Sequence, residues 1–244
     1  MTASKNEFEH FLHRTTFSNY QKIELPYGLQ IQGQEHSKKI AAILPENLAG
    51  KSVLDVGCYY GLYCHEAARR GAHRVLGVEL DERRYSIARE LARLWDDGVE
   101  IWLGDIMEIE IPDKFDLVLF LSVLHHIKDP ILVMSRLAGL CADTMVVEFC
   151  SPLHRLRRKK SQGVSRSGRL FQLVNRFLIR MLNDRVGLIL TGDQILGEKG
   201  YDWTYFFNQR AFLTVFVTQN HFFKEIDFKP SPQKADRILA FCKV

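Results

Sequence analysis

Apolar runs typical of β-strands alternate with helical patterns between residues 35 and 150, and this alternation restricts the fold more than any other feature. The strand-type runs begin with SVLDVG at 52–57 and end with TMVVEF at 144–149. Helical patterns such as DERRYSIARELARLW at 81–95 separate them. Near-continuous apolar strands that alternate with helices form parallel sheets covered on both faces. The chain is therefore predicted to have a doubly wound α/β fold.

The carboxyl-terminal part departs from this alternation. FNQRAFLTVFVTQNHFFKEIDF (207–228) is typical of a helix followed by a strand, and ADRILAFCKV (235–244) is typical of a further strand. Two consecutive strands with a short connection pair antiparallel. We expect a mostly parallel sheet that is closed by an antiparallel carboxyl-terminal hairpin.

Three segments follow from these patterns. Residues 35–150 and 205–244 are expected to form the core, residues 1–34 to cover the ligand site, and residues 151–204 to be an insertion. The window 151–190 carries a net charge of +9, although the whole chain carries only +4.

Within the insertion, LFQLVNRFLIRMLNDR (170–185) has the apolar spacing of an amphipathic helix. A basic amphipathic helix can act as a lid over an acceptor pocket, contact an anionic membrane or dimerise. We favour a lid; peripheral membrane contact through 170–182 and a nucleic-acid partner are kept as weaker alternatives. The remainder of the chain is acidic and carries no recognised RNA-binding module, which argues against broad affinity for nucleic acids.

Composition limits the class of protein. The chain is 46% hydrophobic and 25% charged, as in soluble globular proteins, and no apolar run approaches the ~18 residues of a membrane span. The polar amino terminus is not typical of a secretory signal, so we expect a cytoplasmic protein. Five scattered cysteines without a C-x-x-C pair indicate reduced, buried thiols and no zinc site, and we expect no metal requirement.

The loop D-V-G-C-Y-Y-G at 55–61 is the main functional signal. In the dinucleotide fingerprint G-x-G-x-x-G, the later glycines give room for a pyrophosphate and for close helix packing, but here Tyr59 and Leu62 stand there. NAD is therefore disfavoured, and the absence of G-K-[ST] excludes a P-loop. Asp55 at a strand end and Glu79, which can accept both ribose hydroxyls, remain typical of nucleoside binding. Adenosine without phosphates fits this pattern.

Four motifs in this order extend the signal: D-V-G-C-Y-Y-G, V-L-G-V-E, L-G-D-I and F-D-L-V-L-F-L-S-V-L-H-H-I. Together they resemble the motifs of class I S-adenosylmethionine-dependent methyltransferases, which have a Rossmann-like fold. The resemblance covers residues 23–150 with specific motifs and 205–244 in pattern only. The segment YQKIELPYGLQIQG (20–33) together with the loop also resembles the catalytic domain of wobble-uridine tRNA carboxymethyltransferases.

The resemblance implies S-adenosylmethionine (SAM) as cofactor and S-adenosylhomocysteine (SAH) as product. Tyr59 departs from the family, which usually has glycine there. The implied cofactor residues are Asp55, Gly57, Cys58, Tyr59 and Gly61 in the loop, Glu79 at the ribose, Asp105 and Ile106 at the adenine, Leu121 and Ser122 near the sulfonium, and Leu80 and Gly104 without a more specific position.

The expected reaction is methyl transfer to an oxygen of a small or medium-sized, neutral or anionic acceptor. A histidine near pKa 6.5 suits removal of the acceptor proton, and His125 and His126 follow the fourth strand. Strand alternation directs only one of them to the site; His126 is preferred because it aligns with a histidine of related small-molecule methyltransferases. The alternative is that both only shape the pocket.

For other residues the sequence gives less specific expectations. Glu148 either contacts the acceptor or is a solvated strand end, and Asp116 is expected to be structural because it precedes its strand. Residues that either cover the acceptor or belong to the core are Tyr20, Gln21, Tyr201, Trp203 and Tyr205. Two other functions stay open: a wobble-uridine type tRNA methyltransferase, and a non-catalytic SAM- or SAH-binding module.

Overall fold

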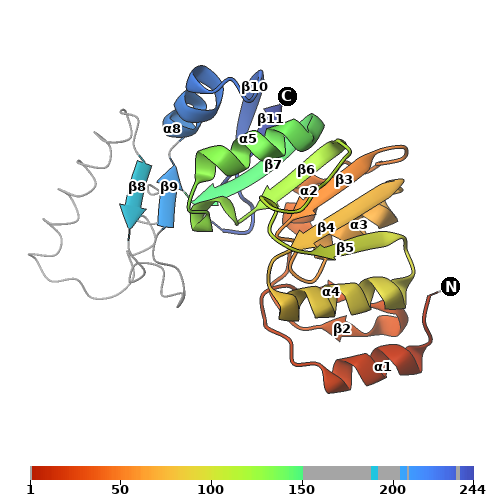
Figure 1. The fold of residues 1–244 in the computed structure, drawn as a ribbon. Helices are drawn as coiled ribbons and strands as arrows, with labels where there is room; N and C mark the ends of the chain where they lie inside the picture. Colours follow the sequence, from red (N-terminus) through yellow and green to blue (C-terminus); the bar gives the residue numbers. More distant parts are fainter. Residues whose placement is uncertain (1, 151–187, 192–203, 208, 235–236) are drawn as a thin grey trace, which may run out of the picture. The chain divides into compact units, whose positions relative to one another are not determined.

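A seven-stranded, mostly parallel sheet forms the framework of the protein (Figure 1). The computed structural model describes residues 2–150, 188–191, 204–207, 209–234 and 237–244. The strand order is β10-β11-β7-β6-β3-β4-β5. The strands are β3 (Ser52–Val56), β4 (Arg74–Glu79), β5 (Val99–Leu103), β6 (Phe115–Leu121), β7 (Cys141–Cys150), β10 (Glu225–Pro230) and β11 (Arg237–Lys243).

The pairing agrees with the sequence prediction. β3 pairs in parallel with both β4 and β6, and β4 pairs in parallel with β5. β11 pairs antiparallel with β7 and with β10, which confirms the carboxyl-terminal hairpin. The strand order reverses at β3, because β4 lies on one side of it and β6 on the other. Ligands of open α/β sheets bind beyond the carboxyl ends of the strands at such a reversal.

The chain divides into two compact units. The first consists of residues up to Leu119 and of 140–143, and the second consists of residues 120–139 and 144–244, as far as these are described. The first unit contains the glycine loop and the ends of β3, β4 and β5. The second contains the end of β6, most of β7 and the hairpin.

Three helices of the first unit lie between residues 37 and 95, and a local feature explains one end of two of them. They are α2 (Ser37–Ile43), α3 (Leu62–Arg69) and α4 (Glu82–Trp95). The side chain of Asp81 accepts the backbone N–H of Arg84 at 2.9 Å, which confirms the predicted cap of α4. Gly71 follows α3 with a φ of +88°, the left-handed conformation that a glycine cap provides.

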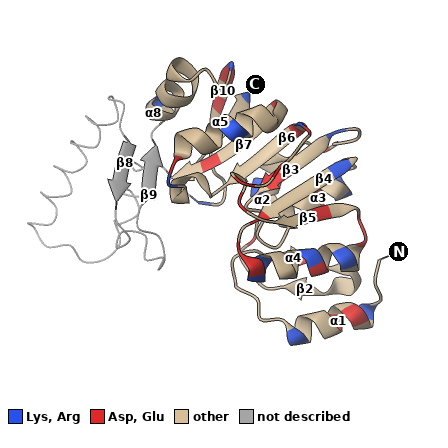
Figure 2. Ribbon diagram, in the orientation of Figure 1, with Lys and Arg blue, Asp and Glu red and all other residues tan. Residues whose placement is uncertain are grey.

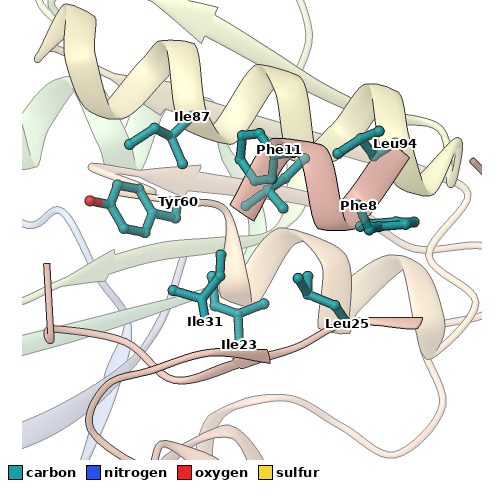
Figure 3. Packing of buried hydrophobic residues seen from close by; sticks show 9 residues of the cluster. Phe8, Phe11, Ile23, Leu25, Ile31, Tyr60, Ile87 and Leu94 are labelled. Atoms are coloured by element: carbon teal, nitrogen blue, oxygen red, sulfur yellow. The ribbon is translucent and has the colours of Figure 1, made fainter. Parts of the chain in front are cut away.

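The amino-terminal segment is part of the first unit's core. It contains α1 (Lys5–Arg14), β1 (Ile23–Glu24), a 3-10 turn η1 (Pro26–Gly28) and β2 (Gln30–Ile31). Phe8 and Phe11 of α1 pack in one cluster with Ile87 and Leu94 of α4 (Figure 3). Arg14 of α1 also donates to Glu90 at 2.7 Å, on a helix that carries both signs of charge (Figure 2).

The described elements of the second unit include short helices and a second hairpin. They are the 3-10 turn η2 (Leu124–His126), α5 (Pro130–Leu140), α8 (Gln209–Leu213), the π-helical turn η4 (Thr214–Gln219), and the antiparallel strands β8 (Leu188–Thr191) and β9 (Thr204–Phe207). The predicted amphipathic helix at 170–182, Tyr201 and Trp203 lie outside the described residues. No helix among the described residues is long and apolar enough to cross a membrane.

Candidate functional site

Asp55 lies near the carboxyl end of β3 and is almost completely buried, with 2% of its surface exposed. The thiol of Cys64 donates to its carboxylate at 3.6 Å. Burial raises the pKa of Asp55 to about 7, and the Cys64 hydrogen bond and the Lys39 ammonium act in the opposite direction. The carboxyl group is therefore poised to ionise near neutral pH, when a cation comes close.

Glu79 ends β4, the neighbouring strand, and is 4% exposed. Its Oε2 accepts the backbone N–H of Tyr59 at 2.9 Å, and its Oε1 accepts that of Asp81 at 3.0 Å. A carboxylate offers about four acceptor positions, so two of them remain for a further ligand. The two backbone bonds orient Glu79 and tie it to the glycine loop.

Tyr59 takes a left-handed backbone conformation with a φ of +59°. Its ring lies 4.2 Å from that of Tyr60 and 4.9 Å from that of Tyr20, between centroids, and the Arg84 guanidinium lies 5.0 Å from its centroid. Its hydroxyl shares a hydrogen bond with Ser18. The phenol is thus held by the amino-terminal segment, while the backbone keeps the conformation that glycine usually provides.

Two glycines are required by close packing around the loop. Gly61 caps α3 with a φ of +81°, and a β-carbon there would lie 3.3 Å from Nε2 of His65. A β-carbon at Gly77 of β4 would lie 2.9 Å from the sulfur of Cys58 and 3.0 Å from that of Cys64. The two buried thiols therefore fill the space beside Gly77, and all five cysteines of the chain are buried, which agrees with the prediction of buried thiols.

The end of β5 is tied to the same edge. Gly104 donates its backbone N–H to the carbonyl oxygen of Glu79 at 3.0 Å. Asp105 accepts the backbone N–H of Met107 at 2.8 Å through its side chain, and Ile106 is buried. The predicted residues at 104–106 thus lie in an ordered turn directly beside the end of β4.

Two large apolar side chains are exposed at this edge. Leu80, which follows Glu79, is 68% exposed, and Leu103, which ends β5, is 42% exposed. Ligand sites combine apolar surface with a few polar groups, and both are present at this edge. The first unit therefore brings together the predicted residues of the loop, of 79–80 and of 104–106.

The remaining predicted residues belong to the second unit. Leu121 ends β6, and Ser122 follows with a φ of +66°. Leu119, two residues before Leu121, is the register partner of Asp55. A role of Leu121 and Ser122 at the cofactor stays a prediction.

The two histidines are not on a strand, contrary to the expectation. β6 ends at Leu121, and His125 and His126 lie in the 3-10 turn η2 with their ring centroids 4.1 Å apart. Strand alternation therefore does not decide which of them faces the site. His125 is 1% exposed, and His126 is half-buried.

Glu148 is not a solvated strand end, so this alternative was wrong. Glu148 is 1% exposed, and it lies on β7 opposite Leu239 of the neighbouring strand β11. Asp116 has the expected structural role: its carboxylate accepts the backbone N–H and the hydroxyl of Ser52, both at 2.9 Å.

Three residues at the site were missed by sequence reasoning. Lys39 is buried on α2, and its positive charge opposes the rise that burial causes in the pKa of Asp55. Ser18 shares a hydrogen bond with the hydroxyl of Tyr59, and the guanidinium of Arg84 lies over its ring. Lys39 shares a helical face with the buried His36 and Ile43, three and four residues away, so the helical spacing was an available signal. Ser18 and Arg84 leave no such signal.

The first unit also contains a cavity of about 780 Å³. Its charged side chains pair with each other: Lys22 with Glu35 at 3.5 Å and Arg70 with Glu66 at 2.8 Å. None of the predicted cofactor residues lines it. Within the described residues, no group of three His, Cys, Asp or Glu side chains is arranged to hold a metal ion.

Comparison with known proteins decides the family. A family model described as a methyltransferase domain matches residues 28–220, most of the chain. The chain belongs to this methyltransferase family. The methyltransferase is 39% identical over 98 residues to the ubiquinone biosynthesis O-methyltransferase of Stutzerimonas stutzeri (strain A1501), over 38% of this chain and 41% of that protein. The match thus spans about two fifths of the length of this curated relative.

Solved structures share the fold at low sequence identity. An S-adenosylmethionine-dependent methyltransferase from Mesorhizobium loti matches with a TM-score of 0.62 and 17% identity, over 86% of this chain and 97% of that chain. The N-terminal domain of EvdMO1, with SAH bound, matches with a TM-score of 0.67 and 13% identity, over 100% of this chain and 98% of that chain. With the family match, the fold makes this a class I SAM-dependent methyltransferase domain.

Proposed function

We propose that the methyltransferase transfers the methyl group of SAM to an oxygen atom of a small or medium-sized acceptor. The observation that carries this proposal is the pair of buried carboxylates, Asp55 and Glu79, near the ends of adjacent parallel strands. SAM combines the ammonium group of its amino-acid end with a ribose diol, and the two carboxylates match these two groups in charge and in hydrogen bonding.

Each predicted residue has a role in this proposal. Asp55, Gly57, Cys58, Tyr59 and Gly61 line the amino-acid end, Glu79 accepts the ribose hydroxyls, and 104–106 with Leu80 receive the adenine. The exposed faces of Leu80 and Leu103 support a purine position, since an aromatic ring would cover apolar surface there. Leu121 and Ser122 are proposed to lie near the sulfonium.

The reaction needs positioning and one proton acceptor. As the bond from the acceptor oxygen to the methyl carbon forms, the bond from carbon to sulfur breaks and its electron pair stays on sulfur. Holding the two atoms close and in line supplies much of the rate. We propose His126 as the base that takes the hydroxyl proton, because it is half-buried whereas His125 is 1% exposed.

The acceptor class is supported by the relatives. The S. stutzeri relative is described as an O-methyltransferase of ubiquinone biosynthesis, and the relative from Neisseria meningitidis serogroup C (strain 053442) carries the same description at 36% identity over 107 residues. An oxygen acceptor also suits a histidine base. The segment 1–34 is proposed to cover the cofactor, and 151–204 to act as a lid over the acceptor.

Calorimetric titration with SAM and SAH tests the proposal. We expect binding in the micromolar range that is lost in Asp55→Ala and in Glu79→Ala. Glu100→Ala, which removes an exposed carboxylate from β5, is the matched control and should bind like the wild type. If the wild type binds neither compound, the proposal is wrong.

The basic window 151–190 supports a second candidate, a tRNA acceptor of the wobble-uridine type. A tRNA-binding isotherm whose affinity falls steeply with salt would favour that function. Absence of tRNA binding at low salt would remove it and leave the small-molecule acceptor.

A further inference from the structure

Glu148 is a buried carboxylate that the proposed reaction leaves without a role. It lies on β7 opposite Leu239 of β11. Its Oε1 accepts the hydroxyl of Ser231 at 2.7 Å, its Oε2 accepts the hydroxyl of Ser122, and Arg237 Nη1 lies 3.9 Å from Oε2. A charge in the interior is tolerated only when it is paired and hydrogen-bonded. Three separate chain segments supply these partners.

Ser122 is the strained member of this cluster. Its φ of +66° lies in the left-handed region, which costs a residue with a β-carbon free energy. Glu148 holds Ser122 twice: its carboxylate accepts the Ser122 hydroxyl, and its carbonyl oxygen accepts the Ser122 backbone N–H at 3.2 Å. Loss of the carboxylate would leave only the backbone hydrogen bond of this pair to oppose relaxation of the Ser122 backbone.

The conformation of Ser122 sets the start of the turn that carries both histidines. Val123 follows directly, and its carbonyl oxygen accepts the backbone N–H of His126 at 2.8 Å. Ile127 donates to Leu124 at 3.3 Å and closes the same turn. Only Ser122 and Val123 connect the end of β6 to the start of η2. A change of φ at Ser122 therefore changes the direction in which the chain enters this turn.

We propose that Glu148 is a positioning residue that acts through Ser122 to fix the direction of the turn carrying His125 and His126. Its consequence for methyl transfer rests on the proposed function, but the positioning itself does not. The carboxylate contacts neither the cofactor nor the acceptor in this role. It sets the geometry of the residues that do.

The test is NMR of the histidine side chains in the full chain, with Glu148→Gln and with Glu225→Gln as the matched control on exposed β10. In Glu148→Gln we expect the ring signals of His125 and His126 and their pH titrations to shift, while those of His36 and His65 in the first unit stay unchanged. Glu225→Gln should leave all four unchanged. Unchanged signals of His125 and His126 in a folded Glu148→Gln protein would overturn the proposal.

Two further variants keep the test decisive. If Glu148→Gln does not fold, Ser122→Ala removes only the hydroxyl and should shift the same two histidines; unchanged signals there would equally overturn the proposal. The double variant Glu148→Gln with Ser122→Gly should bring the histidine signals back towards those of the wild type, because glycine adopts a positive φ without strain. No return in the double variant would contradict a role through Ser122.

A titration with SAH separates this proposal from the proposed function. We expect Glu148→Gln to bind SAH roughly tenfold more weakly than the wild type, because a shift of Ser122, which is proposed to lie near the cofactor, would weaken contacts worth about one hydrogen bond. If the wild type binds no SAH, the proposed function is wrong, and the histidine signals still decide the positioning role. Tight binding by both proteins, with shifted histidines, confines the role of Glu148 to the acceptor side.

Discussion

Asp55 is a carboxyl group that the fold buries, and its ionisation couples stability to ligand binding. Its pKa in the folded protein is raised to about 7 by burial, above the value of 3.8 for an exposed aspartate. Between these two values the folded protein holds a proton that the unfolded chain has released. Stability therefore falls as the pH rises through this window, and a cationic ligand favours the opposite, ionised form.

Cofactor affinity should consequently depend on pH. Below pH 7, binding of the ammonium group of the amino-acid end must displace the Asp55 proton, so affinity for SAH should fall by up to about tenfold per pH unit. Calorimetry in two buffers of different ionisation enthalpy would detect the released proton. Asp55→Asn should bind weakly at every pH; an unchanged slope in this variant would assign the proton to another group.

The stability of the same variant gives an independent check. Asp55→Asn should unfold at higher urea concentration than the wild type at pH 8, where the buried carboxylate is ionised. The difference should shrink towards pH 4, where the folded wild type is neutral at this position. A lower stability of the variant at pH 8 would mean that the charge of Lys39 compensates the burial fully.

Asp116 behaves in the opposite sense. The pKa of Asp116 is lowered to about 2. The largest cause is the hydrogen bond from the backbone N–H of Ser52 to the carboxylate, and the Ser52 hydroxyl and Lys51 add to it. The stabilisation is present above pH 3.8 and is lost as the pH falls towards 2. Asp116→Asn should lower the free energy of unfolding by about 1–3 kcal/mol at pH 7. Urea unfolding at pH 7 and pH 3 would test whether the difference disappears in acid.

At the scale of elements, the turn η2 decides the roles of the two histidines. His126→Ala should lower the rate of methyl transfer by roughly a hundredfold or more if His126 is the base. His125→Ala should mainly lower stability, because the ring of His125 is buried. Turnover of both variants, measured across pH with any acceptor that the wild type methylates, tests this. Near-normal turnover of both would end the hypothesis of a histidine base.

At the scale of the whole molecule, the amino-terminal segment is as much a part of the first unit as the sheet. Phe11 is 2% exposed and lies in the cluster shown in Figure 3. Phe11→Ala should lower the free energy of unfolding by about 3–5 kcal/mol, as for other buried aromatic residues. Leu132→Ala, at a side chain that is 55% exposed on α5, is the control and should change it by less than about 0.5 kcal/mol. Equal effects in urea unfolding would mean that α1 packs only loosely.

The sequence by itself determined the sheet, the caps and the loop. Alternating apolar and helical patterns are local, so β3 to β7, the Asp81 cap and the hairpin of β10 and β11 could be predicted. The end of β6 could not, because SVLHH continues the apolar pattern of the strand while the backbone turns at Ser122.

Only the tertiary structure showed which polar groups are buried and which form hydrogen bonds with one another. The burial of Glu148 and of Lys39, and the bond between Ser18 and Tyr59, join residues far apart in the chain. Burial and long-range hydrogen bonds depend on which elements cover a side chain, and no local pattern encodes this. The residue types at the strand ends therefore indicated the proposed cofactor, whereas packing determined which residues hold the candidate site in place.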